Sequence, residues 1–359
     1  MSKRLTDLFN QISAPVPGWR EDFFTNMRGE RLRYGHAPAI DPDNSRGTIV
    51  MTHGYGEHIE LYNHAIRFYQ ERGFNVWMME WQGHGRSDRH DPVCDTCEDG
   101  TDGPRGMLSH MKDLERFTND IVQKEPGKPV IMSTNSMGGH IGLLALKYNP
   151  DMFDGAIMST PMFDIYRLGL PAFMRPAVQW MFNMLAKTPL ADFQLPGDVK
   201  LLNALTGVGN NLKDSPQGEM DIRREWNQAT RRKYADIQID RPTPEWVAAA
   251  YNTIVPSLKD SFLRAVKTPM LVGSAGKDNL VDNAAIAQVA QHTAQTEVVS
   301  LPSAEHSLWF ENDGNYNSWT GRIDAFLDRL APARVQQPPA PAENGPLIAQ
   351  NRPQLPLAA

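Results

Sequence analysis

Residues 129–148 read PVIMSTNSMGGHIGLLALKY and combine two patterns with an abrupt change between them. The first half is a short apolar run, as in a strand that is buried on both faces. The second half has apolar residues at helical spacing. Ser136, Gly138 and Gly139 stand at the change, and glycines allow a sharp turn because their backbones can approach neighbouring segments closely. The stretch therefore predicts a strand, a tight turn carrying Ser136, and a helix.

The same alternation of apolar runs and amphipathic segments extends along the chain. Buried strands are predicted at 47–53, 74–80, 129–135, 153–160, 268–275 and 296–302, and helices at about 58–72, 109–125, 137–148, 281–292 and 315–330. This order is typical of an α/β protein with a mostly parallel central sheet and helices on both faces. Residues 19–25 and 30–37 predict an additional antiparallel pair at one edge.

The alternation stops between residues 162 and 256, in a segment richer in Met, Trp, Arg and Asn. Because this segment lies between two predicted sheet strands, we interpret residues 162–256 as a helical cap that packs over the carboxyl edge of the sheet. The core then comprises residues 1–161 and 257–331. Residues 332–359 are rich in Pro, Ala and Gln and cannot bury enough apolar surface to become ordered, so we expect a disordered tail.

Charge and composition exclude some classes of protein. The 359 residues carry a formal net charge of −6, so no overall basic field favours nucleic acid, and no nucleic-acid partner is expected. The N-terminus lacks the apolar region of a secretory signal, and no run of about 18 apolar residues predicts a spanning helix. Cys94 and Cys97 are too few for a zinc site of about four ligands, so we interpret them as surface thiols. We expect a cytoplasmic protein and leave peripheral contact with a membrane surface open.

Ser136 and the glycines after it match the second half of the nucleophile-elbow pattern G-x-S-x-G, whose first glycine is replaced here by Thr134. A serine hydroxyl becomes a nucleophile when a base removes its proton and an acid orients that base. The N–H of Met137, at the start of the helix, would face a developing oxyanion. A second donor is expected in the glycine-rich loop HGYG (53–56), where the N–H of Tyr55 is our candidate.

The remaining groups of such a triad should follow in the order Asp or Glu, then His. Asp278 follows the predicted strand at 268–275, and His306 follows the one at 296–302. Taken alone, Asp278 could cap a helix and His306 could be structural, and Asp282 competes for the role of the acid. All the loops concerned follow predicted strands in the required order, so together they favour a catalytic triad.

Five motifs resemble the monoglyceride lipase and bacterial lysophospholipase branch of the α/β-hydrolases, and they extend over about residues 47–330. They are HGYGEH (53–58), WQGHGRSD (81–88), NSMGGHIG (135–142), GKDNLVD (276–282) and AEHSLWFE (304–311). The resemblance implies that Ser136 is the nucleophile, Asp278 the acid and His306 the base. It also implies that the N–H groups of Tyr55 and Met137 are the two oxyanion donors. Such chemistry requires no metal or organic cofactor.

Two residues of the elbow depart from that family. Thr134 stands where Gly or Ala is usual, and Asn135 stands where His is common. The branched side chain of Thr134 suits the end of a strand but needs room beside the following helix. We expect either a more strained elbow or smaller neighbouring residues.

On this resemblance, the expected function is that of a serine carboxylic-ester hydrolase that cleaves the acyl ester of a single-chain lipid, monoacylglycerol or lysophospholipid, through an acyl-enzyme. An esterase or acyltransferase acting on short soluble esters remains an alternative, and so does a non-catalytic binding protein, although that role usually requires a broken triad. Residues 163–187, rich in Phe, Met and Leu, form either the core of the cap or a slot for an acyl chain. The basic cluster at 223–234 is interpreted as a solvated helix face rather than a phosphate site.

Overall fold

The computed structural model describes five stretches of the chain: residues 14–89, 106–165, 171–191, 222–239 and 242–332. Cys94 and Cys97, the middle of the predicted cap and nearly all of the predicted tail lie outside them. The predicted division into core, cap and tail therefore stays a prediction.

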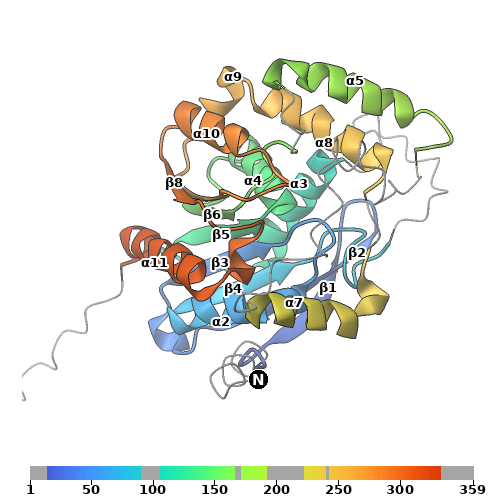
Figure 1. Ribbon diagram of the computed structural model, residues 1–359. Helices are drawn as coiled ribbons and strands as arrows, with labels where there is room; N and C mark the ends of the chain where they lie inside the picture. Colours follow the sequence, from blue (N-terminus) through green and yellow to red (C-terminus); the bar gives the residue numbers. More distant parts are fainter. Residues whose placement is uncertain (1–13, 90–105, 166–170, 192–221, 240–241, 333–359) are drawn as a thin grey trace, which may run out of the picture.

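An eight-stranded sheet runs through the centre of the molecule (Figure 1). The strand order is β1–β2–β4–β3–β5–β6–β7–β8, and the strands are β1 (Arg20–Thr25), β2 (Arg31–Ala37), β3 (Gly47–Thr52), β4 (Phe74–Met79), β5 (Val130–Asn135), β6 (Gly155–Ser159), β7 (Met270–Ala275) and β8 (Thr296–Leu301). The six predicted apolar runs form β3 to β8, which are parallel to one another. β1 and β2 form the predicted antiparallel pair at the edge. The mostly parallel α/β fold is confirmed.

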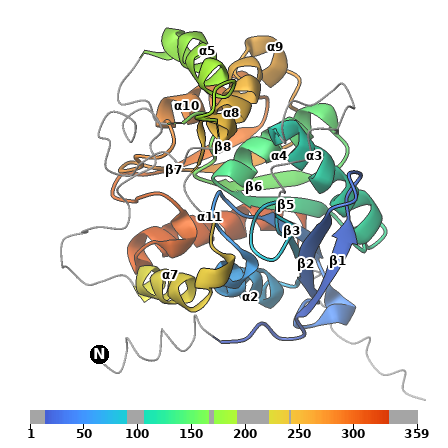
Figure 2. The same ribbon diagram turned by 90° about the vertical axis from the view of Figure 1, so that its right-hand side faces the viewer.

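Helices cover both faces of this sheet (Figure 2). One face carries α2 (Asn63–Glu71) and α11 (Asp313–Leu330), and the other carries α3 (Met107–Arg116), α4 (Met137–Tyr148) and α10 (Asn283–His292). In β3, Val50 belongs to the core beside α3 and α4, whereas Ile49 and Met51 belong to the core beside α2 and α11. Successive residues of a strand point to opposite faces, so a strand that is apolar throughout is buried on both.

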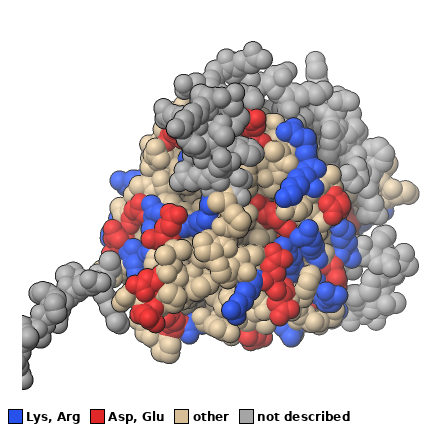
Figure 3. All heavy atoms as spheres, turned by 90° about the horizontal axis from the view of Figure 1, so that it is seen from below, with Lys and Arg blue, Asp and Glu red and all other residues tan. Residues whose placement is uncertain are grey.

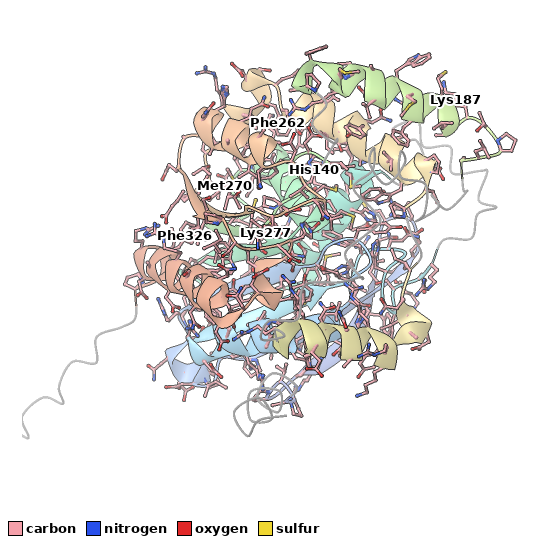
Figure 4. All side chains as sticks on the ribbon, viewed as in Figure 1. His140, Lys187, Phe262, Met270, Lys277 and Phe326 are labelled. Carbon is pink, nitrogen blue, oxygen red and sulfur yellow. The ribbon has the colours of Figure 1, made fainter. Side chains whose placement is uncertain are left out.

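The predicted cap contributes helices that lie in two groups: α5 (Arg175–Leu185) with α8 (Pro244–Ser257), and α7 (Ile222–Lys233) by itself. α5 and α8 pack against each other at the top of Figure 1. A hydrogen bond of 2.8 Å joins Thr253 of α8 to His140 of α4, and Figure 4 labels His140 below these helices. α7 lies beside the short helices η2 (Ile59–Tyr62) and η6 (Leu308–Phe310). Within the described ranges, no helix is both long and apolar enough to span a bilayer.

Arginines of α7 hold this helix to the core. Arg223 is buried, and its guanidinium lies 2.7 Å from Asp313. Arg224 pairs with Glu305 and Glu311, each at 2.8 Å. The interpretation of this cluster as a solvated helix face is wrong for these two arginines, because acidic side chains of the loop after β8 and of the first turn of α11 lie opposite them. Figure 3 likewise shows basic and acidic side chains interspersed on the face seen from below.

Candidate active site

Ser136 occupies a strained turn between β5 and α4. Its backbone angles are φ 50° and ψ −117°, in a region that residues other than glycine rarely adopt. Hydrogen bonds hold the turn: the N–H of Ser136 donates to the carbonyl of Ser159 at 3.0 Å, and its own carbonyl accepts from the N–H groups of Gly139 and Met162. Strain of this kind persists only where the surrounding structure enforces it, and it is concentrated at functional sites.

Gly138 and Gly139 are required by close packing at the start of α4. A Cβ atom on Gly138 would lie 2.7 Å from Thr52 Oγ1, and one on Gly139 would lie 2.4 Å from Pro161 Cβ. Both distances are shorter than real Cβ contacts allow. The first turn of α4 therefore lies directly against the loops that follow β3 and β6.

Thr134 is accommodated by further glycines of α4. Its side chain is buried, and its Cγ2 lies 3.4 Å from the position that a Cβ on Gly142 would occupy. Its Oγ1 lies at the same distance from the corresponding position on Gly139. Two neighbours of Thr134 are therefore glycines, in line with the expectation of smaller neighbouring residues, although a Cβ on either would make only ordinary van der Waals contact with Thr134.

Asp278 and His306 meet in the loops that follow β7 and β8. His306 Nδ1 lies 2.7 Å from Asp278 Oδ2, while Asp278 Oδ1 accepts the N–H groups of Leu280 and Val281 at 2.9 and 3.1 Å. Asp282, the competing acid, instead accepts the N–H of Ala284 as the N-cap of α10. The structure therefore pairs His306 with Asp278, whose carboxylate is oriented by backbone donors.

The pKa of His306 differs in direction from those of the buried histidines nearby. Burial alone lowers the pKa of His306, but the charge and hydrogen bond of Asp278, together with the charge of Glu57, raise it above its ordinary value. Burial lowers the pKa of His53, His84 and His110 to about 3, so these three are neutral at pH 7. His306 is thus the stronger base. In the described residues, no cluster of His, Cys, Asp and Glu is arranged to hold a metal ion.

The loop of His306 is fastened to the strand end that carries Ser136. Ser307 Oγ donates to Asn135 Oδ1 at 3.2 Å, and the N–H of Ser307 donates to Thr160 Oγ1 at 3.1 Å. Ser307 and Thr160 have φ values of 75° and 38°. The chain neighbours of His306 and Ser136 therefore bind each other, which places both residues at the same edge of the sheet.

The loop of Tyr55 runs against Ser136 from the other side. A Cβ on Gly54 would lie 2.9 Å from Ser136 Cβ, so the backbone that leads into Tyr55 is in direct contact with the serine. Met137 is the first residue of α4, and the N–H groups of a first helical turn have no partner within the helix. Gly54, directly before Tyr55, and Met137 thus both adjoin Ser136, and the assignment of the Tyr55 and Met137 N–H groups as oxyanion donors stays a prediction.

Glu57 and Asn135 are parts of this site that the prediction missed. Glu57 Oε2 accepts the N–H of Gly54 at 2.6 Å and the hydroxyl of Tyr62 at 2.5 Å, and Asn135 Nδ2 lies 3.2 Å from both carboxylate oxygens. The sequence carried a signal for each residue, because Glu57 belongs to the motif HGYGEH (53–58) and Asn135 departs from the family pattern. Neither signal indicated that the two side chains meet.

The strand order and the positions of these loops are those of an α/β-hydrolase, and the overall shape agrees. A carboxyl esterase from Bacillus coagulans superposes with a TM-score of 0.65 over 88% of this chain and 99% of its own, at 17% identity. A monoglyceride lipase from Saccharomyces cerevisiae gives 0.64 over 89% and 97%, also at 17% identity. At such identities the likeness is one of fold.

Within this class, the chain belongs to the family described as serine aminopeptidase, S33, whose model matches residues 43–313. A monoacylglycerol lipase of Mycolicibacterium smegmatis is 28% identical over 149 residues, or 39% of this chain and 46% of the lipase. Lysophospholipase L2 of Escherichia coli is 27% identical over 273 residues, or 72% and 73% of the two chains. The chain thus aligns with less than half of the mycobacterial lipase and with most of the lysophospholipase.

Proposed function

We propose that the protein is a serine carboxylic-ester hydrolase in which Ser136 is the nucleophile, His306 the base and Asp278 the acid. The contact of 2.7 Å between His306 Nδ1 and Asp278 Oδ2, beside the strained Ser136, carries this proposal. Asp278 holds the imidazole with its proton on Nδ1, which leaves Nε2 to accept a proton. The names of the relatives, monoacylglycerol lipase and lysophospholipase, support the same chemistry.

In the proposed reaction, His306 Nε2 takes the proton of Ser136 as the serine oxygen attacks the ester carbonyl. The N–H groups of Tyr55 and Met137 bind the oxyanion, and each contributes about 2.7–4 kcal/mol to the transition state. The imidazolium returns its proton to the departing alcohol, which leaves an acyl-enzyme. Water, activated by the same histidine, then attacks the acyl-enzyme and releases the carboxylic acid.

The proposed substrate is a single-chain lipid, monoacylglycerol or lysophospholipid. Val178 and Phe182 of α5 are buried in the same hydrophobic cluster as residues of the sheet, which favours a packing role for these two residues over an acyl slot. Phe173, just before α5, and Trp180, within α5, are 81% and 65% exposed, and Met184 near the end of the same helix is exposed as well. Exposed aromatic side chains favour the interface of a membrane, where such a substrate resides, and we propose peripheral contact through α5.

A fluorophosphonate probe tests the proposed chemistry directly, because it reacts with activated serines. Wild type should be labelled, whereas Ser136→Ala, His306→Ala and Asp278→Asn should lose or strongly slow labelling. Asp282→Asn is the matched control, since asparagine also caps helices and this variant should be labelled at the wild-type rate. Failure of the wild type to react, when a known serine hydrolase reacts in parallel, would contradict the proposal.

A chain-length series then separates the candidate substrates. Monoacylglycerols, lysophospholipids and p-nitrophenyl esters of short and long acids are compared by kcat/KM. A single-chain lipid hydrolase should prefer long acyl chains, whereas preference for short soluble esters, or transfer of the acyl group to an added alcohol, would favour the alternative.

A further inference from the structure

Asn135 joins two loops of the candidate site that are far apart in the sequence. It is the last residue of β5, directly before Ser136, and its side chain is fully buried. Its Nδ2 donates to the carboxylate of Glu57, with 3.2 Å to each oxygen. Its Oδ1 accepts the hydroxyl of Ser307, also at 3.2 Å. One amide thus connects the loop after β3 with the loop after β8.

Glu57 makes the first of these loops rigid. Its carboxylate is buried, and it accepts the N–H of Gly54 at 2.6 Å and the hydroxyl of Tyr62 at 2.5 Å. A buried carboxylate is stable only when its oxygens are bound by donors, so the loop from Gly54 to Tyr62 is folded around this group. Arg231 of α7 approaches Glu57 only to 4.0 Å, which leaves Asn135 as a close donor from the sheet.

We propose that Asn135 is a positioning residue: its amide holds the loop of His306 in register with the loop of Tyr55, on either side of Ser136. This inference rests on the proposed function. The position requires a side chain that donates at one end and accepts at the other, which a neutral amide does. Aspartate would face Glu57 with a second negative charge, and leucine, of similar size, could form neither hydrogen bond.

A matched control lies at the opposite end of the sheet. We call Asn135, Glu57 and Ser307 the carboxyl-end cluster. The amino-end cluster has the same residue types: Asn75 Nδ2 donates to Glu125 Oε2 at 3.0 Å, and Ser45 Oγ donates to the same oxygen at 2.5 Å. Asn75 is the second residue of β4, at the end remote from Ser136. Loss of either asparagine removes similar hydrogen bonds, but only Asn135 lies next to the proposed nucleophile.

The experiment compares Asn135→Leu with Asn75→Leu. For Asn135→Leu we expect kcat to fall about 10- to 100-fold, as small misplacements of catalytic groups do, with KM within about threefold of wild type. The second-order rate of fluorophosphonate labelling should fall in parallel. Asn75→Leu should keep kcat within about twofold while lowering the midpoint of urea unfolding. All rates are taken per folded molecule, from circular dichroism.

Two further variants test the inference even if Asn135→Leu does not fold. Ser307→Ala removes one of the two hydrogen bonds of Asn135 with little change in volume, and its effect on kcat should vanish when Asn135 is already leucine. Asn135→His should restore most of the lost kcat, because a neutral imidazole also has one donor and one acceptor. A merely structural role would instead lower kcat and stability in step for both asparagines.

Two outcomes separate the inference from the function on which it rests. If wild type and Asn135→Leu are labelled at equal rates, or if Ser307→Ala and Asn135→Leu act additively on kcat, the inference is overturned and the proposed function stands. If wild type is not labelled at all, the proposed function fails and the inference fails with it.

Discussion

The two ends of the sheet use the same residue types in different surroundings. In the amino-end cluster, Glu125 is half-buried, and Lys128 forms an ion pair with it at 2.8 Å. In the carboxyl-end cluster, Glu57 is almost fully buried and is bound by neutral N–H and O–H donors. The first arrangement closes a surface loop, whereas the second places a negative charge where it raises the pKa of His306. Burial, not residue type, separates the two roles.

Backbone strain is distributed just as unequally. In the described part of the chain, the residues other than glycine with positive φ are Ser136, Thr160 and Ser307. All three lie at the carboxyl end of the sheet, and hydrogen bonds connect them through Ser159 and Asn135. The same Asn, Glu and Ser side chains occur in both clusters, so residue types alone do not distinguish the candidate site. Strained backbone together with a buried charge does distinguish it.

The largest contrast is expected between the two serines Ser136 and Ser45. Ser136→Ala should lower kcat for an ester substrate about a millionfold, because no other group replaces the nucleophile. Ser45→Ala removes a hydrogen bond to Glu125 and should change only the free energy of unfolding, by about 1 kcal/mol. Turnover of a p-nitrophenyl ester and urea unfolding measure the two effects. Turnover by Ser136→Ala within tenfold of wild type would rule out the proposed nucleophile.

The next contrast concerns the carboxylates Asp278 and Glu125. Asp278→Asn should lower kcat about 10,000-fold, because the amide favours the wrong tautomer of His306. Glu125→Gln, at the amino end, should leave kcat unchanged. Stopped assays measure kcat of both variants, with enough Asp278→Asn protein to detect its residual rate.

The pH dependence of the same pair gives a second test. Only unprotonated His306 can accept the serine proton, and its pKa is raised, so kcat/KM of wild type should increase with pH through a pKa above the ordinary value for histidine. Asp278→Asn removes the charge that raises this pKa, so the acid limb of the residual activity should move to lower pH. Glu125→Gln should leave the limb in place. A shift of the limb to higher pH in Asp278→Asn would contradict the assignment.

Gly139 in the first turn of α4 and Gly127 in the turn before β5 distinguish the effect of close packing from that of backbone strain. Gly139→Ala would bring a methyl group 2.4 Å from Pro161 Cβ, so it should destabilise the fold by about 1–3 kcal/mol and lower turnover by distorting the elbow. Gly127, in the turn before β5, has open space but a φ of 72°, so Gly127→Ala should cost about 1–2 kcal/mol without affecting turnover. Urea unfolding gives the free energy of unfolding of each variant, and turnover of an ester substrate gives its activity. Equal effects on turnover would show that the elbow has no special need for glycine.

The sequence predicted the parts of this molecule that depend on local pattern. The six parallel strands were apolar runs of sufficient length, and the order of Ser136, Asp278 and His306 followed from the loops after those strands. The sheet brings such loops together whatever the details of packing. The contact between Asn135 and Glu57 depends instead on the register of β3 and β5 and on the path of one loop.

The position of α7 was unpredictable for a related reason. Its arginines were visible as a cluster, but their partners lie more than 70 residues away in the sequence: Glu305 and Glu311 in the loop after β8, and Asp313 at the start of α11. Likewise, nothing in the sequence indicated that Gly142, in the second turn of α4, packs beside Thr134. Charge and size are evident from a sequence, whereas the choice of partner among many candidates is made by the tertiary structure.

The smallest effect is expected from two buried threonines, and it decides what the Thr134 departure does. Thr134 Oγ1 near the carboxyl end and Thr48 Oγ1 near the amino end are both buried and have no hydrogen-bond partner among the described residues. Valine has the same shape without the hydroxyl, so Thr134→Val and Thr48→Val should each raise the free energy of unfolding by up to about 1 kcal/mol. If turnover is unchanged in both, Thr134 acts only by filling the space that the glycines of α4 leave. If turnover changes in Thr134→Val alone, its hydroxyl contributes to the elbow in the reacting enzyme, and the difference between the two ends of the sheet extends to this residue.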